Sequence, residues 1–141
     1  MNIDSIQNGI VIDHIAAGRG MQLYHLLHLD QLDCSVAIIK NVHSKKMGRK
    51  DIIKVDAAID VDIDAIGYVD PNATVNIIRD GKLAEKRDIC LPEKLVNVIR
   101  CKNPRCITTT EQELKHVFRL ANREKQIYRC IYCDSEAPRN Q

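Results

Sequence analysis

The pattern of hydrophobic and polar residues before Leu91 predicts five strands and two helices. Residues 9–15 are rich in β-branched side chains, and residues 49–57 alternate between apolar and polar positions. Apolar residues between 21 and 29 recur at helical spacing. Asp80-Gly81 is a strong signal for a hairpin turn. The expected strands are residues 9–15, 33–42, 49–57, 74–79 and 83–90, and the expected helices are residues 21–29 and 60–69.

The order of these elements, β-α-β-β-α-β-β, is typical of a ferredoxin-like arrangement. We therefore expect an α+β fold class, in which an N-terminal antiparallel sheet carries two helices on one face. The strands hold more apolar residues than two short helices can cover comfortably. Because an exposed sheet edge invites pairing, we expect a partner chain to extend the sheet and the protein to form a dimer.

Leu91-Pro92 interrupts the last predicted strand and marks a domain boundary. We expect one domain over residues 1–92 and a second over residues 93–141, with residues 93–100 as a connector. The second domain is predicted to be a small all-β, zinc-ribbon-like module. It has too little apolar material to fold without a further constraint.

Four cysteines in the second domain form two close pairs, Cys101-Lys-Asn-Pro-Arg-Cys106 and Cys130-Ile-Tyr-Cys133. Two pairs on two turns supply the four corners of a tetrahedral Zn²⁺ site. The alternatives are two disulfides or four unrelated buried thiols. Four thiolates leave no position for water or substrate, so one structural zinc per chain is expected, and its binding should be coupled to folding.

Charge and composition argue against a nucleic-acid-binding protein. The formal net charge is +2, whereas a nucleic-acid-binding protein normally carries a clear basic excess. From Cys101 onward there are eight Lys or Arg against five Asp or Glu, and four thiolates on Zn²⁺ nearly cancel that excess. Few aromatic residues are available to stack on bases. A zinc-ribbon nucleic-acid-binding protein is therefore the less favoured alternative.

Membrane insertion, secretion and catalysis are not expected either. The chain has no apolar run of eighteen residues and no signal-peptide core, and its cysteines suit a reducing cytoplasm. Cys34 and Cys90, which lie outside the metal pattern, are expected to be buried and inert. No nucleophile motif is present, and the carboxylates between Asp56 and Asp64 are better explained as a solvated helix start.

One polar set in the first domain is a candidate ligand site. Asp13-His14 interrupts an apolar strand, Lys50 and Lys54 share one face of another strand, and Lys86 lies on the last strand. A carboxylate can accept hydrogen bonds from ribose hydroxyls, and ammonium groups can bind phosphates. The residues alone leave two readings open, a nucleotide site or ordinary polar strand ends.

Several segments resemble those of a known family. Val11-Ile-Asp-His-Ile15, Met47-Gly-Arg-Lys-Asp-Ile-Ile-Lys54, Pro71-Asn-Ala-Thr-Val-Asn76, Leu91-Pro92 and the four-cysteine pattern resemble the regulatory chain of aspartate carbamoyltransferase. The match keeps the same order over nearly the whole chain. It implies an N-terminal nucleotide-binding allosteric domain, a C-terminal zinc domain and no catalysis by this chain.

The resemblance also implies which residues bind the nucleotide. Asp13 would hold the ribose, Lys54 the ribose and base, Lys86 the phosphates, and His14 would lie near the phosphates. Lys50 would reach a second nucleotide or its Mg²⁺. The base would meet backbone groups of Ile3, Asp4 and Ile6, and the pocket would be lined by Val11, Ile52, Asn76, Ile78 and Leu83.

Partners and effectors follow from the same resemblance. Regulatory chains of this family form homodimers, and three dimers hold two catalytic trimers together. CTP, with UTP, inhibits the committed step of pyrimidine biosynthesis, and ATP activates it. Asn103, Tyr132 and Asp134 would face the catalytic chain in the cytoplasmic complex.

Overall fold

The computed structural model describes residues 6–137 and divides the chain into two compact units, Met1–Cys90 and Leu91–Gln141. Each unit has its own β-sheet. Ile3 and Asp4, which the sequence places near the base, lie outside the described residues.

The first unit is built on a five-stranded antiparallel sheet in the order β2-β3-β1-β4-β5. Its strands are β1 (Gly9–Ala16), β2 (Val36–Ser44), β3 (Gly48–Val55), β4 (Thr74–Arg79) and β5 (Lys82–Asp88). The first four strands and two intervening helices have the split βαβ order, and β5 extends the sheet beside β4. The predicted α+β fold is confirmed.

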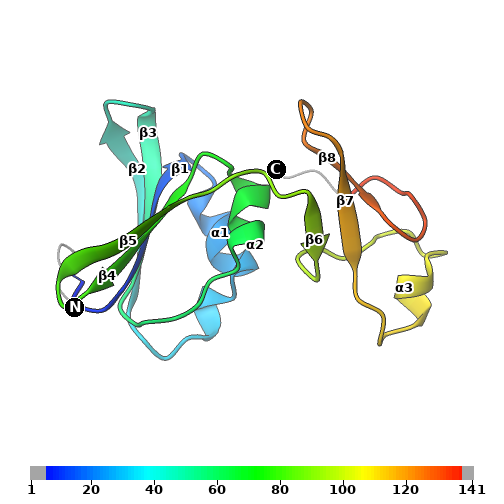
Figure 1. The fold of residues 1–141 in the computed structure, drawn as a ribbon, viewed down its shortest axis with the longest axis horizontal. Helices are drawn as coiled ribbons and strands as arrows, with labels where there is room; N and C mark the ends of the chain where they lie inside the picture. Colours follow the sequence, from blue (N-terminus) through cyan, green and yellow to red (C-terminus); the bar gives the residue numbers. More distant parts are fainter. Residues whose placement is uncertain (1–5, 138–141) are drawn as a thin grey trace. The chain divides into compact units, whose positions relative to one another are not determined.

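Helices α1 (Gly20–Leu26) and α2 (Ile63–Val69) lie on one face of this sheet (Figure 1). The Asp62 carboxylate accepts hydrogen bonds from the backbone N–H groups of Asp64 and Ala65, so it caps the start of α2. The predicted helix over residues 21–29 is too long. His28 adopts a left-handed conformation with φ 56°, and a separate 3₁₀ helix, η1, covers Leu29–Gln31.

Strand register sorts the side chains onto the two faces of the sheet. Ile12 pairs with Ile53 on one side and with Val75 on the other, and all three side chains are buried. They form the centre of the core beneath the helices. Residues at the intervening positions therefore project from the opposite face of the sheet.

The second unit contains the three-stranded antiparallel sheet β6-β7-β8 and a short helix α3 (Ile107–Thr110). Its strands are β6 (Lys94–Val96), β7 (Val117–Asn122) and β8 (Ile127–Cys130). Leu95 pairs with Phe118, which pairs with Cys130, and this row is buried. The prediction that residues 93–100 form only a connector is wrong, because β6 lies within them and supplies Leu95 to the core.

The two cysteines outside the four-cysteine pattern are less buried than expected. Cys90 is exposed and Cys34 is intermediate. The prediction of buried thiols is wrong because Cys90 follows the end of β5, whose residues are all exposed. None of the helices within residues 6–137 combines the length and hydrophobicity that crossing a bilayer requires.

Candidate functional site

The four cysteines of the second unit come together as a cluster. The Sγ atoms of Cys101, Cys106, Cys130 and Cys133 all lie within 4.8 Å of one another. The Sγ–Sγ distance is 3.5 Å between Cys101 and Cys133 and 3.7 Å between Cys106 and Cys130. Zn–S bonds of about 2.3 Å in a tetrahedron place neighbouring sulfurs about 3.8 Å apart, so the cluster fits zinc.

Two tight turns hold the thiols in place. In the first turn, the backbone N–H of Cys106 donates to the carbonyl of Asn103, whose side-chain oxygen accepts from the Arg105 N–H. In the second, the N–H of Asp134 donates to the carbonyl of Cys130, and Asp134 has a φ of 62°. The Asn103 amide also donates to the Ser135 hydroxyl at 3.2 Å, which joins the two turns.

The surroundings of the thiols favour a bound cation. Burial raises the pKa of the Cys101 thiol to about 12, and burial also raises the pKa of Cys130. The side-chain hydrogen bond with Ser135 is the largest cause that lowers the pKa of Cys133, to about 6. A buried set of thiolates is stable only when a cation compensates for the charge. No disulfide joins any of the six cysteines in the structure, and the Sγ–Sγ distances of 3.5 and 3.7 Å are far longer than the roughly 2.05 Å of a disulfide bond.

Two further side chains support the metal ligands, and the sequence pattern did not reveal them. The Thr108 hydroxyl lies 3.1 Å from Cys106 Sγ, and His116 Nδ1 accepts a hydrogen bond from the Cys101 backbone N–H. Such outer contacts orient metal ligands. A hydroxyl two residues after a ligand is the only local signal for Thr108, and His116 is brought in by β7.

The predicted nucleotide residues of the first unit share the sheet face that lies opposite α1 and α2. We call it the binding face. The register runs across four strands, because Lys54 pairs with Val11, Val11 with Asn76, and Asn76 with Lys86. Strand alternation adds Asp13, Lys50, Ile52 and Ile78 to the same face, and a register shift in β5 adds Leu83 by pairing it with Ile78. The structure thus brings these residues together, and their role remains a prediction.

An ion pair lies on the binding face. Lys50 Nζ is 2.9 Å from Asp13 Oδ1, and the side chains are 16% and 20% exposed. Burial on its own would raise the pKa of Asp13, but hydrogen bonds from Lys50 and from the His14 backbone N–H outweigh it and lower the pKa. Asp13 is therefore an ionised acceptor at neutral pH.

His14 and Asn76 are two further polar residues among those predicted to bind the nucleotide. His14 has a φ of 58°, at the irregularity in the pairing of β1 with β3, and its Nδ1 lies 3.0 Å from the Thr74 hydroxyl. The side-chain Oδ1 of Asn76 is buried and has no hydrogen-bond partner within the described part of the chain. Ile6 is buried near Gly9, so its backbone is held beside the start of β1.

The sequence analysis also missed Asp51, which lies on the core face of β3 and is fully buried. Its Oδ2 accepts from the backbone N–H groups of Gly18 and Gly20, and its Oδ1 accepts from that of Asn41. A Cβ atom on Gly20 would approach Asp51 Oδ2 to 2.8 Å, so glycine is required there. From β3, Asp51 thus accepts a hydrogen bond from the first backbone N–H group of α1.

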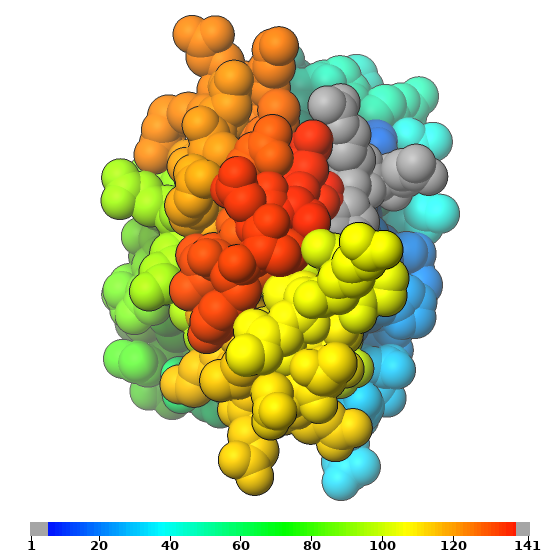
Figure 2. All heavy atoms as spheres, turned by 90° about the vertical axis from the view of Figure 1, so that its right-hand side faces the viewer, coloured from blue at the N-terminus to red at the C-terminus, as the bar shows by residue number. Residues whose placement is uncertain are grey.

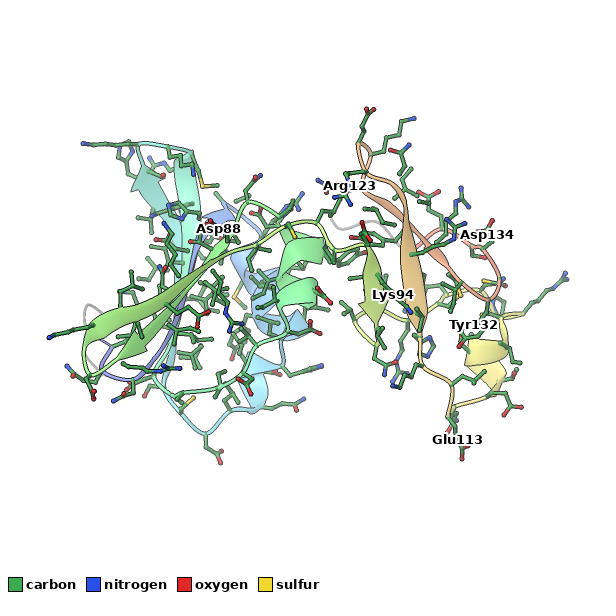
Figure 3. The ribbon with its side chains drawn as sticks, in the orientation of Figure 1. Asp88, Lys94, Glu113, Arg123, Tyr132 and Asp134 are labelled. Atoms are coloured by element: carbon green, nitrogen blue, oxygen red, sulfur yellow. The ribbon has the colours of Figure 1, made fainter. Side chains whose placement is uncertain are left out.

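The three predicted partner-contact residues lie around the metal turns. Tyr132 is 45% exposed, and Figure 3 shows it on the loop after β8. Asp134 is also exposed, but its carboxylate is paired with Arg119 at 2.8 Å. Figure 2 shows the segment of residues 131–137, in red, against α3 and its flanking loop, in yellow. The exposed Ile107 and Ile131 belong to these segments.

Comparison with known proteins places both units in one family. Residues 1–90 match the family described as "Aspartate carbamoyltransferase regulatory chain, allosteric domain", and residues 93–141 match its "metal binding domain". The chain belongs to the aspartate carbamoyltransferase regulatory chain family. It is therefore a regulatory, non-catalytic chain, and the nucleic-acid-binding alternative is not favoured.

Proteins named "Aspartate carbamoyltransferase regulatory chain" resemble it over nearly their whole length. That of Clostridium tetani is 50% identical over 135 residues, which covers 95% of this chain and 94% of the relative. That of Clostridium acetobutylicum is 47% identical over 134 residues, covering 95% and 92%. That of Bifidobacterium longum is 47% identical over 137 residues, covering 97% and 99%. The family assignment thus rests on both units.

Proposed function

We propose that this chain senses nucleotides for aspartate carbamoyltransferase. The domain of residues 1–92 binds CTP and UTP as inhibitors and ATP as activator, and the domain of residues 93–141 attaches to catalytic chains. The second domain holds one structural Zn²⁺ through its four cysteines. Half-exposed and exposed free thiols at Cys34 and Cys90 suit a reducing compartment, so we place the complex in the cytoplasm.

The cross-strand row on the binding face is the observation that carries this proposal. It has a lysine near each end, Lys54 and Lys86, with Val11 and Asn76 between them. A centre of one apolar side chain and one amide, flanked by cations, suits a nucleotide, because the base needs an apolar contact and a hydrogen-bond partner and the phosphates need positive charge. Lys86 is exposed on β5, where a triphosphate can reach it from solvent.

Asp13 and Asn76 supply the acceptors that a nucleotide needs. The ionised Asp13 can accept hydrogen bonds from ribose hydroxyls at the oxygen that Lys50 does not occupy. The buried Asn76 Oδ1, which lacks a partner in the described structure, can accept from the exocyclic amino group that cytosine and adenine share. Lys50, whose Nζ lies 2.9 Å from Asp13 Oδ1, would meet a second nucleotide or its Mg²⁺.

The metal domain gives the catalytic chain a surface to bind. The metal would hold the two turns together and supply only structural stabilisation, since four thiolates leave no open position. The turns present Asn103, Tyr132 and Asp134, together with exposed apolar residues. A folded metal centre is therefore required for attachment, and we expect three regulatory dimers to join two catalytic trimers.

A homodimer is proposed to form at the β2 edge of the first sheet. Residues 36–39 of β2 are apolar and only partly buried, although β2 is an edge strand. The other edge, β5, is exposed throughout and carries five charged residues, which discourage pairing. A second copy added beside β2 would cover the apolar segment.

Regulation requires that each nucleotide binds the two states of the assembly with different affinity. Coupling free energies of this kind are typically about 1–3 kcal/mol. CTP and ATP share ribose and triphosphate, so their opposite effects must come from the base. We therefore expect the base-facing residues around Val11 and Asn76 to determine the sign of the effect.

Calorimetric titration of CTP and ATP into the full-length chain tests the nucleotide site. Lys86→Ala should lower the affinity for both nucleotides about tenfold, which corresponds to one lost charge-assisted contact. Lys45→Ala, in the exposed turn between β2 and β3, removes the same charge outside the row and should have little effect. Equal affinities in the wild-type chain and both variants would remove Lys86 from the site.

A further inference from the structure

A hollow of about 720 Å³ opens in the second unit beside the metal ligand Cys101. We call it the Arg100 hollow. The segment leading into the first metal turn forms one side of it, and residues 108–116 form the other. No role in the account above uses it.

Positive charge predominates around the Arg100 hollow. Arg100 and Lys115 are exposed, and no ion pair involves either of them among residues 6–137. His116 Nδ1 accepts from the Cys101 N–H, so in the neutral ring Nε2 carries the proton and is a donor. The one lining carboxylate belongs to Glu113, whose side chain points away from the domain in Figure 3.

The metal centre fixes the walls of the Arg100 hollow. Cys101 lies in its lining, and Thr108, also in the lining, contacts Cys106 Sγ at 3.1 Å. The two walls are also joined directly, because the Asn97 side chain accepts from the His116 backbone N–H at 2.9 Å. A concave surface with fixed walls loses little conformational entropy when a partner binds, so it is pre-organised for an extended acidic group.

We propose that the Arg100 hollow receives an acidic segment of the catalytic chain. This proposal rests on the proposed function, in which the metal domain attaches to that chain. Arg100 and Lys115, which form no ion pair among residues 6–137, and the His116 Nε2–H donor complement carboxylates, and complementary charge raises the rate of association and fixes the register of an interface. The volume accommodates several side chains, and the hollow adjoins α3 with its exposed Ile107.

Binding of purified catalytic trimer to the intact regulatory chain tests the proposal. Surface plasmon resonance at several salt concentrations would compare the wild type with Arg100→Glu, Lys115→Glu and the double variant. The double variant should bind at least about tenfold more weakly and lose much of the salt dependence. Lys125→Glu, in the exposed turn between β7 and β8, makes the same charge reversal outside the lining and should bind as the wild type does.

Zinc content and CTP affinity, measured on the same preparations, should be unchanged, which would exclude misfolding as the cause. If the wild type itself does not bind the trimer, the proposed attachment fails and this inference fails with it. If the wild type binds and the double variant matches Lys125→Glu, only the assignment of the hollow is overturned. Loss of self-association in the double variant, with trimer binding intact, would mean that a second copy fills the hollow and would also overturn it.

Discussion

The substitution Asp13→Asn tests whether the ion pair on the binding face supports nucleotide binding and folding stability. Asp13 Oδ1 lies 2.9 Å from Lys50 Nζ and accepts from the His14 backbone N–H at 2.6 Å. Asparagine keeps the shape of the side chain and one acceptor oxygen but removes the charge. We therefore expect weaker nucleotide binding and a smaller loss of folding stability.

The size of both effects follows from burial. Only 20% of the Asp13 side chain and 16% of the Lys50 side chain are exposed, so solvent screens the pair weakly. A hydrogen bond to a charged group contributes about 1.5–3 kcal/mol, part of which the asparagine oxygen retains. We expect the free energy of unfolding to fall by about 1–2 kcal/mol. The lost contact to ribose should lower the affinity for CTP and ATP about 10- to 100-fold.

The pH dependence of this effect has a definite sign. Burial opposes ionisation of Asp13, but the hydrogen bonds from Lys50 and His14 prevail, so its pKa in the folded chain lies below the unfolded value. The stabilisation is therefore complete above the unfolded pKa and is lost as the pH falls through the lower, folded pKa. The stability difference between wild type and Asp13→Asn should stay constant around neutral pH and shrink only in acid.

Calorimetry with CTP and ATP and urea denaturation measure these two quantities. Asp30→Asn in η1 is the matched control, since its carboxylate is exposed. The reasoning is refuted if Asp13→Asn and Asp30→Asn bind nucleotides with affinities within about twofold of each other while both remain folded.

Three further substitutions test other parts of the structure. Cys106→Ser should lose the metal and unfold the second unit, by metal analysis and circular dichroism, whereas Cys90→Ser should keep one zinc per chain. Asp51→Asn should lower the free energy of unfolding by about 2–4 kcal/mol, because its amide would face a backbone donor; an unchanged urea midpoint would contradict this. Ile39→Lys on β2 should dissociate the dimer in analytical ultracentrifugation, and Ala84→Lys on β5 should not.

Several features of the fold and the metal site are predicted by short stretches of sequence. β-Branched residues located β1, alternation located β3, Asp80-Gly81 located the turn between β4 and β5, and cysteine spacing located the metal cluster. Gly81 has a φ of 75°, which explains why glycine occupies the turn. Each of these signals lies within a few neighbouring residues, so the sequence alone reveals it.

Features that depend on distant contacts could not be predicted. Asp51 occupies a core position because N–H groups of the loop before α1 and of β2 satisfy it, and nothing near it in sequence shows this. Strand β6 has only three residues, too few for a recognisable pattern, and is defined by its pairing with β7. Apolar residues continue at helical spacing to Leu29, so the sequence does not show where α1 ends. The left-handed backbone of His28 separates α1 from η1.

Alignment of the polar residues across four strands was partly foreseeable. Asp13 stands out as a charge in an apolar strand and Lys54 shares a strand face with Lys50, but the common face of Asp13, Lys54 and Lys86 follows only from the register of the sheet. Asn76 drew attention only through the family resemblance, and its unpaired buried oxygen became visible only in the structure.

The most direct test of the central claim is the activity of a reconstituted assembly of catalytic trimers and this chain, followed as CTP and ATP are titrated. CTP should lower activity and ATP should raise it in the assembly, and neither nucleotide should affect isolated catalytic trimers. An assembly that forms with its full complement of zinc, yet shows the same activity at every nucleotide concentration, would contradict the claim.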